Sequence, residues 1–209
     1  MSDIIRDPQA IEARSFEIID AEVGVHTFSE DEWPIVRRIV HTSADYDFVM
    51  NTLITDGAVI SGIKAISEGC QIYCDTNMVL SGVNKSRLAE FGCSISCHVA
   101  DPDVAAQAKA EGVTRSIVAL RKGVASGAKI FLIGNAPTAL YELLQLCADG
   151  KVDPALVVGV PVGFVGAAES KEELVASGLP QITCRGRKGG STIAAAICNA
   201  LVLLAKARG

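Results

Sequence analysis

The 209 residues predict an α/β fold: a three-layer α/β/α sandwich with a mainly parallel, five-stranded sheet, preceded by a helical N-terminal third. Three observations predict it. Five short apolar or β-branched segments alternate with helical patterns, which is typical of a parallel sheet. Several of these segments are apolar without interruption, as expected of strands that are covered on both faces. The first begins only near residue 71, after a third of the chain whose patterns are helical.

The five predicted strands are mostly bounded by Gly, Asp or Pro. They are Gln71–Cys74, Cys93–His98, Lys129–Ile133, Leu156–Val160 and Gln181–Cys184. Their alternation with helices resembles the flavodoxin-like group. Ligands of such sheets bind outside the carboxyl ends of the strands. We therefore expect the functional site among the loops that follow these segments.

Helical spacing separates and follows the predicted strands. The predicted helices are Val104–Glu111, Ser116–Ser126, Pro137–Ala148, Lys171–Ala176 and Thr192–Ala205. Ile117, Leu120 and Val124 show the i, i+3, i+7 spacing of one helix face. Asp101 and Ser170 precede two of these helices and are residue types that favour the N-cap position.

The N-terminal third predicts three helices. The first is the amphipathic stretch Ala10–Ala21, and the third runs from about Phe48 to Ser67, weakened by two glycines. Between them, Ser29 and Glu32 have the spacing of a capping box, and Pro34 favours a somewhat later start for the helix that ends near residues 41–45. We find no internal repeat or linker, so residues 1–209 are expected to form one domain.

Composition excludes several classes of function. There are 19 basic and 24 acidic residues, a formal net charge of −5, and 5% aromatic residues. This balance disfavours broad nucleic-acid binding and base-stacking platforms. The sequence contains no run of about 18 apolar residues and no apolar segment near Met1–Pro8, so we expect neither a membrane span nor a signal peptide and predict a cytoplasmic protein.

Seven cysteines, an odd number, argue against a disulfide framework. Cys70 and Cys74 are four residues apart, as are Cys93 and Cys97, and His98 follows. A zinc- or iron-binding regulatory module is one alternative, although structural zinc sites favour closer pairs on turns. Because the segments between these cysteines have the composition of strands, we favour buried thiols that pack as small apolar groups and predict no metal site.

His41 is the histidine with the most suggestive position. It ends an apolar helix, beside Thr42, Ser43 and Asp45. Two interpretations stay open: a helix-terminal histidine that complements the helix dipole, or a general acid, since imidazole titrates near neutrality. The nucleophile-elbow pattern G-x-S-x-G is absent from the sequence.

A glycine-rich loop, Gly186–Ser191, opens the last helix and contains Arg187 and Lys188. Exposed backbone N–H groups, a helix N-terminus and two cations together favour an anion. The loop does not match the Walker A pattern, but a nucleotide- or phosphate-binding protein remains an alternative. Asn135 follows a strand and is either a helix cap or a ligand-binding amide, and Arg115 is either a solvated cation or a carboxylate clamp.

Several loops in a fixed order suggest a family. They are Ala13–Phe16, Val40–His41, Cys74–Val79, Gly134–Leu140, Pro161–Val165, Glu169–Glu172 and Gly186–Ser191. This ordered set, which extends over nearly the whole chain, resembles the precorrin-8X methylmutase (cobalt-precorrin-8 methylmutase) family of cobalamin biosynthesis. Each motif alone is weak, and the specificity lies in their order.

The resemblance implies an isomerase that moves a methyl group from ring carbon 11 to ring carbon 12 of a corrinoid, giving hydrogenobyrinate or cobyrinate. The shift is intramolecular, so no cofactor is expected. His41 would be the acid, and the substrate-binding residues implied by the resemblance or by charge are Ser15, Arg14, Val83, Asn84, Arg115, Asn135, Arg187 and Lys188. The family also implies a homodimer with the substrate, a polycarboxylate, near the interface. The sequence does not decide whether the substrate holds cobalt. It also does not decide whether the product passes directly to neighbouring pathway enzymes.

Overall fold

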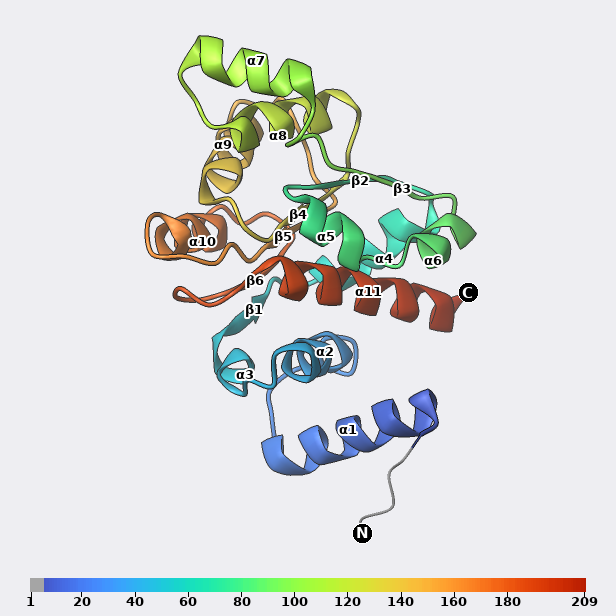
Figure 1. The fold of residues 1–209 in the computed structure, drawn as a ribbon. Coiled ribbons are helices and arrows are strands. Elements are labelled where there is room, and N and C mark those ends of the chain that lie inside the picture. Colours follow the sequence, from blue (N-terminus) through green and yellow to red (C-terminus); the bar gives the residue numbers. More distant parts are fainter. Residues whose placement is uncertain (1–5) are drawn as a thin grey trace.

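The computed structural model describes residues 6–209, and a mixed sheet lies at its centre (Figure 1). The strands are β1 (Thr52–Ile54), β2 (Gln71–Cys74), β3 (Ser94–Ser96), β4 (Ile130–Ile133), β5 (Leu156–Gly159) and β6 (Gln181–Cys184). Their order across the sheet is β1-β6-β5-β4-β2-β3. All neighbouring pairs are parallel except β1 and β6, which are antiparallel.

Helices cover both faces of the sheet and add an outer layer. They are α1 (Pro8–Val23), α2 (Trp33–Ser43), α3 (Asp47–Asn51), α4 (Ala58–Ser67), α5 (Asn77–Gly82), α6 (Lys85–Glu90), α7 (Pro102–Glu111), α8 (Arg115–Ala125), α9 (Pro137–Ala148), α10 (Ala167–Ala176) and α11 (Ser191–Arg208). The helices α4, α5, α6 and α11 share one core with the sheet, and α8, α9 and α10 share the other. Outside this sandwich, α2 packs on α11, and α1 packs on α2 (Figure 1).

The two cores follow from the alternation of side chains along each strand. In β4, Ile130 and Leu132 face α11, whereas Phe131 and Ile133 face α9. Since successive side chains of a strand point to opposite faces, a strand that is covered on both faces must be apolar throughout. The sequence prediction of a three-layer sandwich with a mainly parallel sheet is therefore confirmed.

The predicted strand number was wrong, since the sheet has six strands rather than five. The additional strand, β1, lies inside the segment Phe48–Ser67 that was predicted as one helix, and it splits that segment into α3, β1 and α4. Thr52, Leu53 and Ile54 pair with Cys184, Thr183 and Ile182. A strand of three residues has too short a pattern to identify, and here a partner far along the chain determines its conformation.

Some predicted boundaries also change. The strand predicted as Cys93–His98 is shortened to Ser94–Ser96, and α10 begins at Ala167 rather than Lys171, with Gly166 as its cap. Ser170 therefore lies inside α10, where its hydroxyl donates to the carbonyl of Ala167. Asp101 occupies the N-cap position of α7, but its side chain caps no N–H group there.

The capping box before α2 does form. The Glu32 carboxylate accepts from the N–H of Ser29 at 2.9 Å, and the N–H of Glu32 donates to the Ser29 hydroxyl at 3.3 Å. The helix begins just after it, at Trp33, and Pro34 occupies the first turn, where its missing N–H costs nothing.

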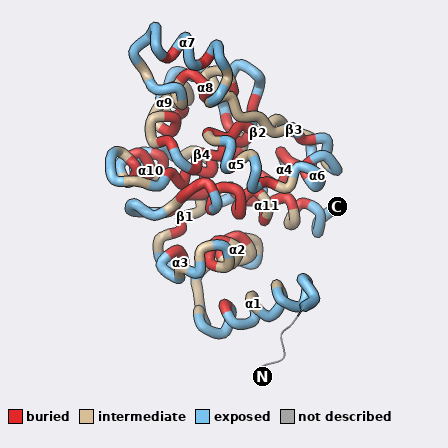
Figure 2. The backbone as a smooth tube through the Cα atoms, viewed as in Figure 1, coloured by how far each residue is buried: buried red, intermediate tan, exposed pale blue. Residues whose placement is uncertain are grey.

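By length and composition, α11 is the one helix of residues 6–209 that could cross a membrane. Most of it is buried inside the protein, as the red tube of α11 in Figure 2 shows. Its small residues, among them Ala194, Ala195 and Ala196, let it pack closely between the sheet and α2. It is therefore the central helix of the core.

Candidate active site

The loops that follow β2, β4, β5 and β6 meet at the carboxyl edge of the sheet, where the sequence predicts the site. Asp75, directly after β2, is fully buried and accepts hydrogen bonds from three successive N–H groups of the loop after β4. Gly134 donates at 3.0 Å, Asn135 at 2.7 Å and Ala136 at 2.8 Å. These donors lower the pKa of Asp75, but the larger effect of burial raises it. Asp75 thus fixes the main chain at the start of α9.

The start of α11 is held against the same edge. The hydroxyls of Thr76 and Ser191 hydrogen-bond at 3.0 Å. A Cβ atom on Gly134 would lie 2.8 Å from the Cα of Ser191, so a glycine is needed for this close approach. The loop before α11 continues the arrangement, since the N–H of Gly190 donates to the carbonyl of Val160 at 2.8 Å. All four loops are therefore joined by direct hydrogen bonds.

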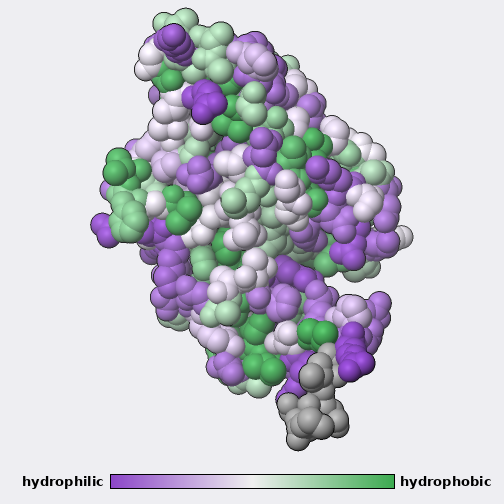
Figure 3. Space-filling view, in the orientation of Figure 1, coloured by the Kyte–Doolittle hydropathy of each residue, from purple (hydrophilic) through white to green (hydrophobic). Residues whose placement is uncertain are grey.

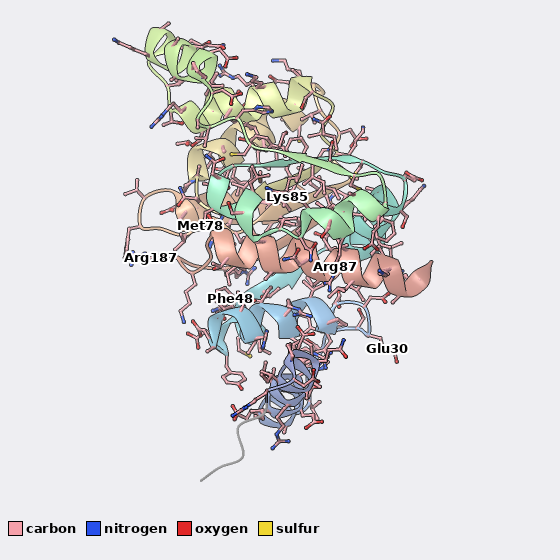
Figure 4. All side chains as sticks on the ribbon, turned by 45° about the vertical axis from the view of Figure 1, so that its right-hand side comes forward. Glu30, Phe48, Met78, Lys85, Arg87 and Arg187 are labelled. Atoms are coloured by element: carbon pink, nitrogen blue, oxygen red, sulfur yellow. The ribbon has the colours of Figure 1, made fainter. Side chains whose placement is uncertain are left out.

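In the Gly186–Ser191 loop the two predicted cations have different surroundings. The Lys188 ammonium pairs with Asp45 at 2.5 Å and with Asp47 at 2.7 Å, so its charge is already compensated. Arg187 is exposed and lies over the Phe164 ring, 5.3 Å from its centroid, with no carboxylate partner among residues 6–209. Figure 4 shows Arg187 and Met78 at the same end of α11. Arg187 is therefore the cation of this loop that is free to meet an anion.

Exposed apolar side chains surround Arg187. Met78, Val162, Phe164 and Val165 are all exposed, Val165 to 89%. In the space-filling view, apolar side chains gather at the side of the molecule where α10 lies (Figure 3). A surface that combines exposed apolar groups with an unpaired guanidinium suits a ligand that has both an apolar face and carboxylates.

His41 lies in the last turn of α2, as predicted, and is partly buried. Its imidazole packs edge-on against the Phe16 ring of α1, with 5.3 Å between ring centroids. Ala44, which ends the helix, has φ of 51°, the only positive φ of a non-glycine residue in the part of the chain that is described. Such strained residues persist where the surrounding structure determines the conformation, and they cluster at functional sites.

Two arginines of α2 were missed by the sequence analysis. Arg38 pairs with Glu12 at 2.5 Å, and Arg37 pairs with Asp20 at 2.7 Å. Both guanidinium groups also lie within 5 Å of the Phe16 ring centroid. The hydrogen bond from Arg38 lowers the pKa of Glu12, against the opposing effect of burial. The electrostatic effects of Arg38, His41 and Arg87 lower this pKa slightly further. The signal that could have found them is their spacing, since Arg37 and Arg38 precede His41 by about one helical turn.

The predicted residues of α1 point to different environments. Ser15 is partly buried, and its hydroxyl donates to the carbonyl of Ile11 one turn earlier at 2.8 Å. Arg14 is exposed and pairs with Glu17. Phe16, the residue after Ser15, contacts His41, whereas Arg14 faces solvent.

Val83 and Asn84 join α5 to α6. Val83 is buried, and the Asn84 side chain caps α6 by accepting from the N–H of Arg87 at 3.1 Å. The main-chain N–H of Asn84 donates to the Asn199 side chain on α11 at 2.8 Å. Lys85 and Arg87 follow, both exposed and without a carboxylate partner among the described residues, beside α11 in Figure 4. The segment is thus fixed to α11 and presents two free cations.

Arg115 and Asn135 complete the predicted set. Arg115 opens α8, is exposed and forms no ion pair within residues 6–209; the cap of that helix, Thr114, hydrogen-bonds the Thr138 hydroxyl of α9 at 3.0 Å. Asn135 has an exposed side chain and is not the cap of α9, since Ala136 holds that position. The structure therefore places Arg115, Asn135 and Arg187 on the rim of the sheet, and His41 and Ser15 in the outer helical layer.

Four of the cysteines lie in or beside β2 and β3. The Cys74 thiol donates to the carbonyl of Ser96 at 3.4 Å, and the Cys93 thiol donates to the carbonyl of Ile66 at 3.2 Å. Burial raises the pKa of Cys70 to about 12. Residues 6–209 contain no group of three or more His, Cys, Asp or Glu side chains that could hold a metal ion. His98 instead contacts Asp101 at 3.0 Å, and Asp101 also pairs with Lys122.

Comparison with known proteins identifies the family. The sequence pattern of the precorrin-8X methylmutase family matches residues 10–204. A cobalt-precorrin-8 methylmutase from Leptospira interrogans is 47% identical over 95% of this chain and 94% of its own length, and one from Priestia megaterium is 48% identical over 95% and 88%. The crystal structure of a precorrin-8X methylmutase from Thermus thermophilus has a TM-score of 0.90 and 43% identity, covering 96% of this chain and 98% of that one. The chain belongs to the precorrin-8X methylmutase family.

Proposed function

We propose that this chain is an isomerase of corrin-ring biosynthesis that moves a methyl group from ring carbon 11 to ring carbon 12 of precorrin-8 or its cobalt form. The observation that carries the proposal is the family match. The matched residues, 10–204, include the four loops at the carboxyl edge of the sheet and α2 with His41. The reaction rearranges one molecule, so its atoms balance without a methyl donor or a redox cofactor. We further propose that residues 1–209 act as one domain, since one sheet combines strands from Thr52 to Cys184.

We propose His41 as the general acid. Protonation of the conjugated macrocycle would favour the tautomer from which the methyl group migrates, and the proton would return to His41 after the shift. Imidazole is suited to both steps because it titrates near neutrality. The Phe16 ring beside His41 and the partial burial of the imidazole support this role, because they restrict its orientation and its contact with water.

The carboxylates of the substrate need cations or N–H donors in a protein whose net charge is −5. Arg187 and Arg115 are exposed and have no carboxylate partner within the described chain. The exposed apolar groups around Arg187 support contact with the face of a macrocycle. We propose that Arg187 and Arg115 bind substrate carboxylates and that Ser15, Val83, Asn84 and Asn135 make shorter-range contacts. Arg14 and Lys188 are already paired with carboxylates of this chain and are the weaker candidates.

We also propose a cytoplasmic homodimer. The support is α1, which packs on α2 and exposes Ile11 and Ile18 to more than 40%. Apolar residues exposed on a helix in an outer layer are typical of surfaces that bind a partner. A second copy seated there would cover these residues close to Ser15 and His41.

The test is an absorbance titration of the purified protein with hydrogenobyrinic and cobyrinic acids, followed by turnover of precorrin-8X and cobalt-precorrin-8. We expect tight binding with a changed visible spectrum, and conversion of one or both substrates; the preferred one identifies the route. ATP and inorganic phosphate serve as controls for the phosphate-binding alternative, and metal analysis for the regulatory one. Thermal stabilisation by ATP or phosphate with no corrinoid binding would overturn the proposal.

A further inference from the structure

Lys171, in the middle of α10, is the most deeply buried cation of the described residues, with 1% of its surface exposed. No carboxylate pairs with it within residues 6–209. Its ammonium donates to the main-chain carbonyl of Lys188 at 2.7 Å and lies 3.8 Å from the Cys184 sulfur. Burial lowers the pKa of Lys171, because a charge is costly in an apolar environment. A lysine held at this cost needs a function that an apolar residue could not perform.

The carbonyl that Lys171 binds belongs to the loop between β6 and α11. The Cys184 thiol donates to the same oxygen at 3.1 Å. At its start the loop is attached to α3, because the N–H of Arg185 donates to the carbonyl of Asn51 at 2.8 Å. At its end, Gly189 packs so closely on the Val160 carbonyl that a Cβ atom would lie 2.2 Å from that oxygen. Between these two attachments, the N–H of Gly163 donates to the carbonyl of Arg187 at 3.2 Å, and Lys171 holds the main chain of Lys188, the residue whose side chain extends away from the loop.

The Lys188 side chain reaches the segment that follows His41 in the sequence. The Lys188 ammonium bridges Asp45 and Asp47, residues 143 and 141 positions earlier in the chain. The same segment is ordered by its own short contacts: the N–H of Asp47 donates to the Asp45 carboxylate at 3.0 Å, and the N–H of Asp45 donates to the Ser43 hydroxyl at 3.2 Å. The strained Ala44 lies between them and the end of α2.

We infer that Lys171 is a positioning residue: by fixing the main chain of Lys188, it places the Lys188 ammonium between Asp45 and Asp47 and so orients the end of α2 that carries His41. The inference deepens the proposed function, on which its catalytic consequence rests. The structural part of the inference rests on three contacts: Lys171 with the Lys188 carbonyl, and the Lys188 ammonium with Asp45 and with Asp47. It does not depend on the identity of the substrate.

The experiment compares Lys171→Met, Lys188→Met, the double variant and Lys151→Met with the wild type. Methionine keeps most of the lysine volume but has no donor. Lys151 is an exposed lysine paired with Asp149 and lies outside the network, so its variant is the matched control. The chain has three histidines, which makes imidazole NMR signals readily assignable, and His98, bound to Asp101 beyond β3, serves as the internal reference.

We expect the His41 signal to move in both single variants, the double variant to add no further shift, and the His98 signal to stay in place. In turnover assays, we expect kcat to fall about 10- to 100-fold, the range for a misplaced catalytic group, with a smaller change in KM. Lys151→Met should match the wild type in both measurements.

An unchanged His41 signal in Lys171→Met or in Lys188→Met would overturn the inference, and so would equal shifts of all three histidines, which indicate general loosening of the fold. Because Lys188 is exposed, its variant tests the link even where Lys171→Met does not fold. If the His41 shifts follow the expected pattern but the wild type converts no corrinoid, the positioning role stands and the proposed function fails.

Discussion

The loops at the carboxyl edge of the sheet and the α1–α2 layer that carries His41 both contribute to the candidate site, but different interactions hold them. The loops are fixed by buried ionisable groups, Asp75 and Lys171, which bind main-chain atoms. The contacts of α1 with α2 include the Arg37–Asp20 and Arg38–Glu12 ion pairs, a hydrogen bond from the Trp33 indole N–H to Asp20, and the aromatic contact of Phe16. Unsatisfied buried groups are costly, whereas ion pairs whose carboxylate is exposed, as Asp20 and Glu12 are, contribute less. The loops are therefore preorganised, and α1 is the part of the site that can adjust.

The largest expected effect is that of His41→Ala. The variant should fold, because the imidazole is only partly buried, and it should still bind the product while turnover falls by a factor of about 10² to 10⁴, the range for a general acid. Steady-state turnover together with product titration measures both properties. A well-folded His41→Ala with normal kcat would show that His41 is not the general acid and that the α1–α2 layer does not supply it.

Next in size is Asp75→Asn, which tests the preorganised loops. An amide has one acceptor oxygen where the carboxylate has two, and its NH₂ group would face an N–H of the loop after β4. The expected loss is about 1–3 kcal/mol in the free energy of unfolding, as for an unsatisfied buried donor. Urea unfolding provides the value. Stability equal to the wild type would show that these N–H groups find other acceptors.

Lys171 makes a smaller, pH-dependent contribution whose sign follows from its lowered pKa. Between that value and the ordinary 10.5, the unfolded chain binds more protons than the folded chain, so stability rises with pH through this window. Cys184 and Glu172, which act on the same ammonium, oppose the shift. We expect the difference in Tm between wild type and Lys171→Met to increase from pH 7 to pH 10. A constant difference would mean that Lys171 stays protonated in the folded protein throughout.

The smallest effect is expected from Arg37→Ala, which removes one ion pair between α2 and α1 together with the contact of the guanidinium with the Phe16 ring. The Asp20 partner is 42% exposed, so the loss should be about 0.2–1 kcal/mol and should shrink at high ionic strength. Chemical denaturation at low and high salt measures it, with Arg14→Ala as a control for an ion pair within α1. A loss above about 2 kcal/mol would show that α1 is held as firmly as the loops.

The sequence predicted the regular part of the fold because that part has a local cause. The apolar run Ile130–Ile133 is a strand from its composition alone, and Pro137 begins a helix for the same reason. Other features have distant causes. The strand β1 exists because β6 pairs with it, and the sequence around Lys171 has the composition of an exposed helix although the fold buries that lysine.

The candidate site divides in the same way. His41 and the Gly186–Ser191 loop were found because helix ends and glycine-rich turns have recognisable patterns. The different partners of Arg187 and Lys188 could not be predicted, since they depend on how residues 45 and 47 approach the loop. For the same reason the pairing of Arg38 with Glu12, 26 residues earlier, left no pattern in the sequence.

The antiparallel pairing of β1 with β6 also determines when the site is assembled. During synthesis the N-terminal third emerges before the rest of the sheet. Within the described residues, β1 has no neighbouring strand until Cys184 has been made, and the Asp45 carboxylate has no cationic partner until Lys188 follows. Closing loops of this length is entropically costly and slows folding. His41 is thus translated well before the residues that complete its surroundings, so a chain that ends before β6 contains the proposed acid without a site around it.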